Sequence, residues 1–185
     1  MVCEHASESG RAFLATTGAE FAYAEREMWL GRLRKRGRRT EGLSMRQANA
    51  GDIETIVSLL ATDSGNFAAV EEHVMDLMGK PGGYRLYLAT LHGQPLGTVR
   101  LDFMQEVIGI YAFEVRLGYR GLGYGREMLE QLIHIAQAES DKPIMLDVET
   151  DNTNAVGLYL SCGFEVKTTY DYYKLSLEKI ISCTG

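Results

Sequence analysis

Three glycines alternate with larger residues in a short segment that connects a predicted strand to a predicted helix. The segment reads Arg120, Gly121, Leu122, Gly123, Tyr124, Gly125, Arg126. Glycine lacks the Cβ atom that keeps a ligand away from the main chain, so successive backbone N–H groups can point at one anion. The helix N-terminus adds unpaired N–H groups and partial positive charge, and the two arginines add side-chain charge. This combination is suited to binding a pyrophosphate.

Two other phosphate-binding motifs fit this segment poorly. A P-loop requires GxxxxGK followed by serine or threonine, and no such lysine pattern can be drawn here. A dinucleotide-binding fingerprint requires GxGxxG, whereas the third glycine, Gly125, comes one residue early and the preceding strands are predicted to be antiparallel. A tight turn whose glycines serve only close packing remains an alternative on the glycines alone.

A second motif follows the next predicted strand and lies on a helix. It consists of Asn152, Ala155, Leu158, Tyr159, Gly163 and Phe164. Together with the glycine-rich segment, in this order and with this strand and helix context, it resembles the GNAT superfamily of acyl-CoA N-acyltransferases. The resemblance covers the chain from about Met45 to the C-terminal strands. It implies an α/β fold with a mixed, mostly antiparallel central sheet and helices on both faces.

The resemblance also implies how acetyl-CoA, the co-substrate, would be held. Backbone N–H groups from Gly121 through Arg126 would bind the CoA pyrophosphate. The strand residues Phe113 to Val115 would pair with the pantetheine arm, and the N–H of Val115 would polarise the thioester carbonyl. Asn152 would contact the cofactor or an ordered water.

Tyr159 and one carboxylate are the candidate catalytic groups. By the resemblance, Tyr159 would protonate the departing CoA thiolate, and a buried core tyrosine is the alternative. The attacking amine must lose a proton, and Asp147 stands where some members of the superfamily carry a catalytic glutamate. Glu149, on the same strand face, and Glu114 are the next candidates for the base. For each of the three, an ordinary surface carboxylate remains the alternative.

The hydrophobic pattern predicts that residues 44–185 form the α/β domain that positions these groups. Strands are predicted at 44–48, 84–91, 95–103, 107–115, 144–149 and 164–177, and helices at 53–60, 67–78, 123–138 and 153–161. Asp52 is predicted as the N-cap of the first of these helices. Ligands bind beyond the carboxyl ends of strands in such sheets, so the ends of strands 107–115 and 144–149 are the expected site.

Residues 1–43 are predicted to be an N-terminal extension that ends in a basic linker. Ser7 to Leu30 can be laid over Asn152 to Leu175 without gaps, which places Leu14 where the second motif has Tyr159. This faint repeat predicts a remnant, a helix plus a hairpin, of a preceding acyltransferase-like domain. An unrelated helix with a mobile tail is the alternative. Exposed remnant strands would favour a homodimer.

Composition and charge limit the class of protein. With 45% hydrophobic and 24% charged residues, the 185-residue chain is typical of globular proteins. It has no long apolar run and no secretory signal, so we expect neither a membrane partner nor export from the cytoplasm. The three widely spaced cysteines predict no disulfide framework and no metal site. A net charge of −6 argues against a nucleic-acid partner and favours a cationic substrate.

These observations predict an enzyme that transfers the acetyl group of acetyl-CoA to a primary amine of a small molecule or peptide. The amine would attack directly, in a ternary complex. The alternative is a non-catalytic domain of the same fold that binds or senses acyl-CoA, because a fold does not guarantee an activity.

Overall fold

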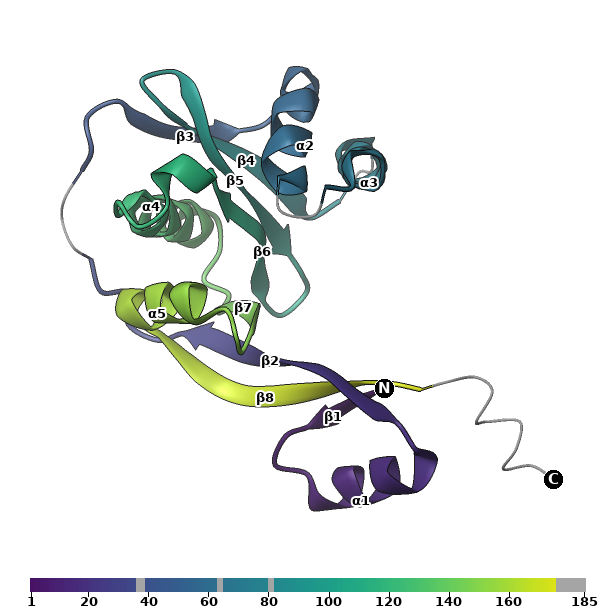
Figure 1. Ribbon diagram of the computed structural model, residues 1–185. Coiled ribbons are helices and arrows are strands. Elements are labelled where there is room, and N and C mark those ends of the chain that lie inside the picture. Colours follow the sequence, from purple (N-terminus) through teal and green to yellow (C-terminus); the bar gives the residue numbers. More distant parts are fainter. Residues whose placement is uncertain (36–38, 63–64, 80–81, 176–185) are drawn as a thin grey trace. The chain divides into compact units, whose positions relative to one another are not determined.

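The computed structural model describes residues 1–35, 39–62, 65–79 and 82–175, which form two compact units (Figure 1). Unit 2 is the continuous stretch Arg32–Met145, and unit 1 combines Met1–Gly31 with the chain from Leu146 onward. Residues 36–38 of the predicted basic linker and residues 176–177 of the last predicted strand lie outside the described residues.

Unit 2 contains an antiparallel ladder of four strands. These are β3 (Leu43–Gln47), β4 (Tyr84–Leu91), β5 (Gln94–Phe103) and β6 (Ile108–Val115), and each pairs with the next along the chain. The central strands β4 and β5 each bury four consecutive residues, 86–89 and 96–99. Because neighbouring residues of a strand face opposite sides, both faces of the ladder must be covered.

Helices cover the two faces of this ladder (Figure 1). α4 (Tyr124–Glu139) lies on one face, and α2 (Ile53–Ala61) and α3 (Phe67–Gly79) lie on the other. One core cluster consists of Ile56, Val57, Val74 and Leu86, and the other of Ala89, Leu96 and Met128. The predicted fold class, an α/β fold with a mostly antiparallel sheet and helices on both faces, is confirmed.

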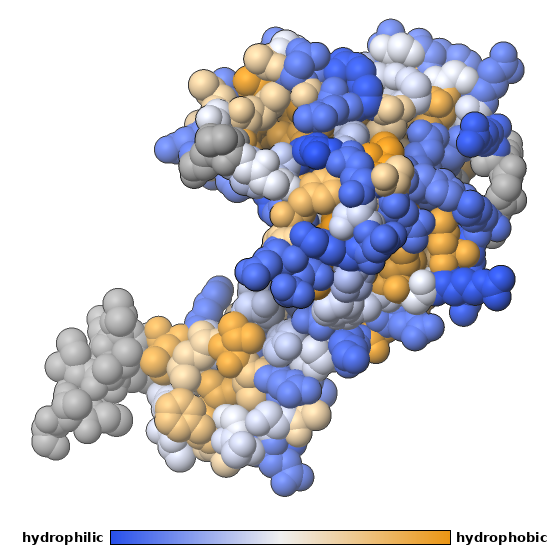
Figure 2. Space-filling view, turned by 180° about the vertical axis from the view of Figure 1, so that it is seen from behind, coloured by the Kyte–Doolittle hydropathy of each residue, from blue (hydrophilic) through white to orange (hydrophobic). Residues whose placement is uncertain are grey.

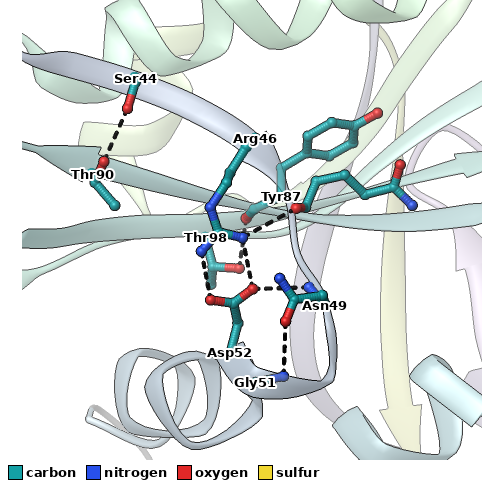
Figure 3. Close-up of polar contacts among 9 residues, drawn as sticks. Ser44, Arg46, Asn49, Gly51, Asp52, Tyr87, Thr90 and Thr98 are labelled. Atoms are coloured by element: carbon teal, nitrogen blue, oxygen red, sulfur yellow. Dashed lines mark hydrogen bonds and ion pairs between the residues drawn. The ribbon is translucent and has the colours of Figure 1, made fainter. Parts of the chain in front are cut away.

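An ion pair fixes the start of α2 (Figure 3). Two guanidinium nitrogens of Arg46, on β3, donate to the two carboxylate oxygens of Asp52 at 2.7 Å each, and the N–H of Asn49 donates to the same carboxylate at 2.8 Å. The hydrogen bond from Arg46 holds the pKa of Asp52 below its usual value. Asp52 occupies the N-cap position of α2, as the sequence predicts, but its side chain makes no capping bond to the helix. Instead, the Asn49 side chain accepts from the N–H of Gly51 in the preceding turn at 2.9 Å.

Unit 1 is built from two strand–helix–strand modules. The N-terminal module is β1 (Val2–Glu4), α1 (Glu8–Thr17) and β2 (Glu20–Leu30). The C-terminal module is β7 (Ile144–Glu149, in unit 1 from Leu146 on), α5 (Thr153–Cys162) and β8 (Phe164–Lys174). The strand order is β1-β8-β2-β7. Each module therefore receives a strand of the other between its own two strands, and β2 and β8 run side by side (Figure 1).

The two modules match in detail. Both helices have 10 residues, and both long strands have 11. Each helix starts at a side-chain N-cap, Ser7 or Asn152, whose oxygen accepts from the N–H three residues on. Each helix also ends at a glycine in the left-handed conformation, Gly18 with φ 64° and Gly163 with φ 105°. The ungapped repeat seen in the sequence is therefore also a repeat of local structure.

Across the described parts of both units, residues 1–35, 39–62, 65–79 and 82–175, no helix is long and apolar enough to cross a bilayer.

Candidate active site

The glycine-rich segment of unit 2 has an open main chain. Gly121 and Gly123 adopt left-handed conformations, with φ 76° and 92°, which side-chain-bearing L-residues rarely adopt. No heavy atom lies within 4 Å of the point where a Cβ atom would stand at either glycine. The glycines are therefore required by the backbone conformation, and not by close packing against a neighbour.

The amides of this segment are available to an anion. α4 begins at Tyr124, and the first helix-type hydrogen bond runs from the N–H of Glu127 to the carbonyl of Gly123 at 3.3 Å. The amides of Tyr124 and Gly125 precede that bond, at positions of a helix that have no acceptor within it. In the described chain, no main-chain hydrogen bond from the amides of residues 121–125 is found. Successive donors at a helix N-terminus are the arrangement that binds phosphate groups.

A pocket of about 270 Å³ lies beside this segment. It is lined by Thr40, Gly121, Leu122, Gly123, Tyr124, Arg126, Glu127 and Glu130. Arg126 is held in the pocket wall by its Nε, which lies 2.9 Å from a carboxylate oxygen of Glu130, one helical turn further on. The pocket wall thus combines main-chain donors with a positioned guanidinium group.

A β-bulge shapes the end of β6, the strand that precedes the segment. Ala112 has a φ of 49°, and two residues of β6, Ala112 and Phe113, stand opposite the single residue Val99 of β5. A bulge bends a strand and re-aims the residues that follow. Here those residues are Glu114 and Val115, both of which sequence analysis assigned to the site.

Arg120 connects the end of β6 to the glycine-rich segment. Its Nε donates to the carbonyl of Val115 at 2.8 Å, and its guanidinium group forms an ion pair with Glu114. The carboxylate of Glu114, one of the three candidate bases, is therefore paired with a cation. An ion pair favours the charged carboxylate and weakens it as a base, which places Glu114 behind the other candidates.

Tyr159 is a buried residue of α5 in unit 1. Its side chain is 7% exposed, and its ring packs edge to face on Phe164, with 5.8 Å between the centroids. Asn152 caps the same helix, because its side-chain oxygen accepts from the N–H of Ala155 at 3.2 Å. Both side chains thus have structural roles that accompany the roles implied by the second motif.

The surroundings of Asp147 perturb its carboxylate. It lies on the exposed side of β7, where partial desolvation, followed by the negative charges of Glu25 and Glu27, raises its pKa. Tyr172 donates a hydrogen bond to Glu25, which raises the pKa of Tyr172, and its ring stacks on Tyr23 at a centroid distance of 4.5 Å. Strand β2 therefore supplies negative charge beside the strand that carries Asp147.

A family model decides the classification of the chain. The model of the acetyltransferase (GNAT) family matches residues 51–164, which include the glycine-rich segment, Asp147 and Tyr159. The chain belongs to the GNAT acetyltransferase family. The predicted resemblance to this superfamily is confirmed.

Two named relatives match parts of this GNAT protein. A mycothiol acetyltransferase of Corynebacterium glutamicum is 33% identical over 69 residues, or 37% of this chain and 24% of that protein. An L-methionine sulfoximine/L-methionine sulfone acetyltransferase of Pseudomonas aeruginosa is 26% identical over 138 residues, or 66% of this chain and 80% of that protein. Against the first of these relatives, the GNAT chain spans about a quarter of the length.

Solved structures share the fold of this GNAT protein. A GCN5-related N-acetyltransferase from Sphaerobacter thermophilus is similar with a TM-score of 0.75 and 18% identity, over 95% of this chain and 59% of that one. A GNAT-family acetyltransferase from Colwellia psychrerythraea gives a TM-score of 0.71 and 15% identity, over 95% of this chain and 64% of that one.

The sequence-predicted residues of this GNAT site fall into two groups. Phe113, Glu114, Val115 and residues 120–126 lie together in unit 2, and Asp147, Glu149, Asn152 and Tyr159 lie together in unit 1. Sequence analysis missed Glu25, Glu27, Thr40 and Glu127. The first two appear in the sequence only as alternate polar residues of a strand in the N-terminal segment, and nothing in that pattern links them to Asp147.

Proposed function

We propose that this protein transfers the acetyl group of acetyl-CoA to a primary amine of a small molecule or peptide, by direct attack in a ternary complex. The observation that carries the proposal is the row of open amides at the start of α4, beside left-handed Gly121 and Gly123. These donors suit the pyrophosphate of CoA. In a member of an acetyltransferase family, a pyrophosphate-binding site fits acetyl-CoA as the acyl donor.

The residues that would hold acetyl-CoA lie on two consecutive elements of unit 2. The amides of residues 121–126 would bind the pyrophosphate, with charge from Arg120 and Arg126. Beyond the bulge at Ala112, the main chain of residues 113–115 would pair with the pantetheine arm. The N–H of Val115 would donate to the thioester oxygen, and this contact strengthens as negative charge develops there.

Two residues of unit 1 would manage the protons. Asp147 would accept a proton from the substrate ammonium, and the freed amine nitrogen would form a bond to the thioester carbon as the carbon–sulfur bond breaks. Tyr159 would give its hydroxyl proton to the departing thiolate, and its phenolate would regain a proton from the nitrogen, which loses its second proton as the amide forms. Asn152 would contact the cofactor or an ordered water. The raised pKa of Asp147 supports its role, because a base is most effective when its pKa lies near the working pH. Glu149, on the same strand face, is the second choice for the base.

The acceptor is proposed to be cationic. Asp147, Glu25 and Glu27 place three carboxylates near one another in unit 1, and the net charge of the chain is −6. Negative charge attracts an ammonium group and disfavours a nucleic acid. The relatives named for mycothiol and for methionine sulfoximine support small molecules that carry amino groups as the first class to test.

We further propose that residues 1–43 are the remnant of a preceding acyltransferase-like domain and that this remnant supports a homodimer. The repeat of the two modules of unit 1 supports the first point. The second is supported by the edge position of β1 and by the apolar surface of the N-terminal module (Figure 2). The exposed apolar residues of this module include Val2, Phe13 and Phe21. Light scattering that shows a monomer would contradict the dimer.

We place the reaction in the cytoplasm. Cys3 and Cys162 support this placement, because both are buried thiols without a disulfide, as is common in reducing compartments.

The pyrophosphate site is tested by calorimetric titration with acetyl-CoA. Gly123→Val forces a side chain into the open space before the amides, and we expect it to abolish measurable binding. Gly93→Val is the matched control, because Gly93 also has a left-handed backbone, with φ 79°, and open surroundings, but lies in the β4–β5 turn. Equal affinity of the two variants would show that the phosphate groups bind elsewhere.

The transfer itself is tested by release of CoA thiol in the presence of an amine panel. Polyamines, aminoglycosides, amino acids, methionine sulfoximine and peptides with free N-termini cover the proposed acceptors. An N-acetyltransferase releases thiol with at least one of them and yields the acetylated amine by mass spectrometry. Tight binding of acetyl-CoA without release by any acceptor would indicate a sensing domain instead.

A further inference from the structure

The chain that precedes β3 is fastened to the first turn of α4. The backbone N–H of Thr40 lies 3.0 Å from both carboxylate oxygens of Glu127, and its hydroxyl donates to one of them at 2.7 Å. Charge-assisted hydrogen bonds of this kind are stronger than neutral ones. Glu127 therefore holds Thr40 at a defined place beside the glycine-rich segment.

A second contact fastens the same part of the chain. Nη2 of Arg126 donates to the backbone carbonyl of Arg34 at 2.6 Å, while its Nε pairs with Glu130. Arg34 and Thr40 are thus both attached to consecutive residues of α4. Both precede residues 51–164, the part matched by the family model, so these contacts belong to the N-terminal segment of this chain.

Thr40 and Glu127 both line the pocket beside the glycine-rich segment. A carboxylate in the first turn of a helix is stabilised by the helix dipole, but it would repel a diphosphate that binds at the same terminus. The two donors of Thr40 take up oxygens of that carboxylate and so reduce the repulsion. Glu127 is half-buried, and its carboxylate is hydrogen-bonded within the chain. A carboxylate without these bonds would oppose the binding of an anion at this helix terminus.

We propose that Glu127 is a positioning residue for acetyl-CoA, which fixes Thr40 as a wall of the pocket that receives the phosphorylated part of CoA. The inference rests on the proposed function and adds a contribution of the N-terminal segment to the cofactor site. It assigns Glu127 no part in the chemical step. Loss of the contact should therefore raise the KM for acetyl-CoA and leave kcat nearly unchanged.

The test compares variants of the full chain. Glu127→Ala removes all three hydrogen bonds, and we expect the KM for acetyl-CoA and the calorimetric Kd for CoA to rise about tenfold, with kcat within about twofold. Thr40→Val removes only the hydroxyl donor and should raise both constants about threefold. Thr40→Ser keeps the donor and should restore both constants to the wild-type values. Glu139→Gln is the matched control, because Glu139 pairs with Arg85 at the other end of the same helix.

The outcomes separate this inference from the proposed function. If the wild-type protein binds no CoA, the proposed function fails. If the wild-type protein binds CoA and Glu127→Ala binds it equally well or more tightly, the positioning role is overturned. Thermal unfolding of each variant identifies a general loss of structure. Such a loss would also lower the affinity of Thr40→Ser for CoA. An equal rise in KM for Thr40→Ser and Thr40→Val would likewise contradict the role of the hydroxyl.

Discussion

The two modules of unit 1 have the same backbone and different chemistry. Leu14 of α1 and Tyr159 of α5 occupy equivalent positions and are buried to a similar degree, 5% and 7% exposed. Extended without a gap to the start of the chain, the same alignment places Val2 opposite Asp147, and the two N-caps are Ser7 and Asn152. The strand–helix–strand arrangement therefore needs a large buried side chain on the helix, but it needs neither a hydroxyl there nor a carboxylate on the preceding strand. The polar groups of the C-terminal module are additions to a common scaffold.

The modules also differ in what each receives from the other. Strand β2 of the N-terminal module places Glu25 and Glu27 near Asp147 and raises its pKa. Strand β8 of the C-terminal module runs beside β1, where Glu4 accepts a hydrogen bond from Thr168 at 3.0 Å. The N-terminal module thus lacks the proposed catalytic groups but adjusts the carboxylate of its counterpart. Substitutions at equivalent positions can test this asymmetry.

The largest effect is expected at Tyr159. Replacing it with phenylalanine keeps the buried ring and removes the proton donor, and kcat should fall about 100-fold while acetyl-CoA affinity changes little. The equivalent change in the other module, Leu14→Phe, should leave kcat unchanged. Steady-state kinetics on both variants check this. An unchanged kcat for Tyr159→Phe would remove the hydroxyl from the mechanism and make the modules chemically alike.

The second effect concerns Asp147. Asp147→Asn should lower kcat/KM about tenfold near neutral pH, because water can replace a base in part. The loss should shrink at high pH, where more of the substrate amine is already neutral. Glu149→Gln, on the same face of β7, is the control, and its kcat/KM should be close to that of the wild-type protein. A larger loss for Glu149→Gln would transfer the role of base to Glu149.

Removal of the helix N-caps should have a smaller effect. The loss of stability should be nearly equal in the two modules, whereas the loss of acetyl-CoA affinity should not. Ser7→Ala and Asn152→Ala each remove one capping hydrogen bond, and each should cost about 1 kcal/mol of unfolding free energy. Only Asn152→Ala should also weaken acetyl-CoA binding. Chemical denaturation and calorimetry separate the two effects. Equal acetyl-CoA affinity in both variants would limit Asn152 to its capping role.

The smallest effect is expected from a substitution in the N-terminal module, which should displace the pH profile of kcat/KM. Glu25→Gln removes a negative charge near Asp147, which favours the ionised form and lowers the pKa of Asp147. A base is active when it is deprotonated, so the acidic limb of kcat/KM should move to lower pH. Glu4→Gln, on β1, should leave this limb in place. A displacement to higher pH after Glu25→Gln would exclude Asp147 as the group that titrates in the limb.

Much of the local structure could be predicted from the sequence. The bounds predicted for β4 and β7, 84–91 and 144–149, agree with the structure, because runs of apolar residues end there at turn-forming residues. The conformation of Gly121 and Gly123 could also be predicted from the sequence, because few residues other than glycine adopt a positive φ. Both signals are local and need no knowledge of distant partners.

The pairing of strands between the modules was not predictable in the same way. The faint repeat predicted a helix plus a hairpin within residues 7–30, but it contains no information on which strand β2 joins, so the charge that β2 brings to Asp147 was not predicted. The N-cap position of Asp52 was predicted correctly, but the bonding of its carboxylate was not, for a related reason. Arg46 lies on a neighbouring element and competes for the carboxylate, which a propensity for the N-cap position does not take into account.

The place of β2 in unit 1 has a consequence for how the chain folds as it leaves the ribosome. Leu30 of β2 pairs with Phe164 and Glu20 pairs with Lys174, so both partners are synthesised only after all of unit 2. Until then, β2 has no partner strand from the C-terminal module, while the mostly local pairings of unit 2 can already form. Pairing between such distant segments is slow, and it exposes the nascent chain to aggregation. Chaperone demand and expression yield should therefore depend on the first thirty residues.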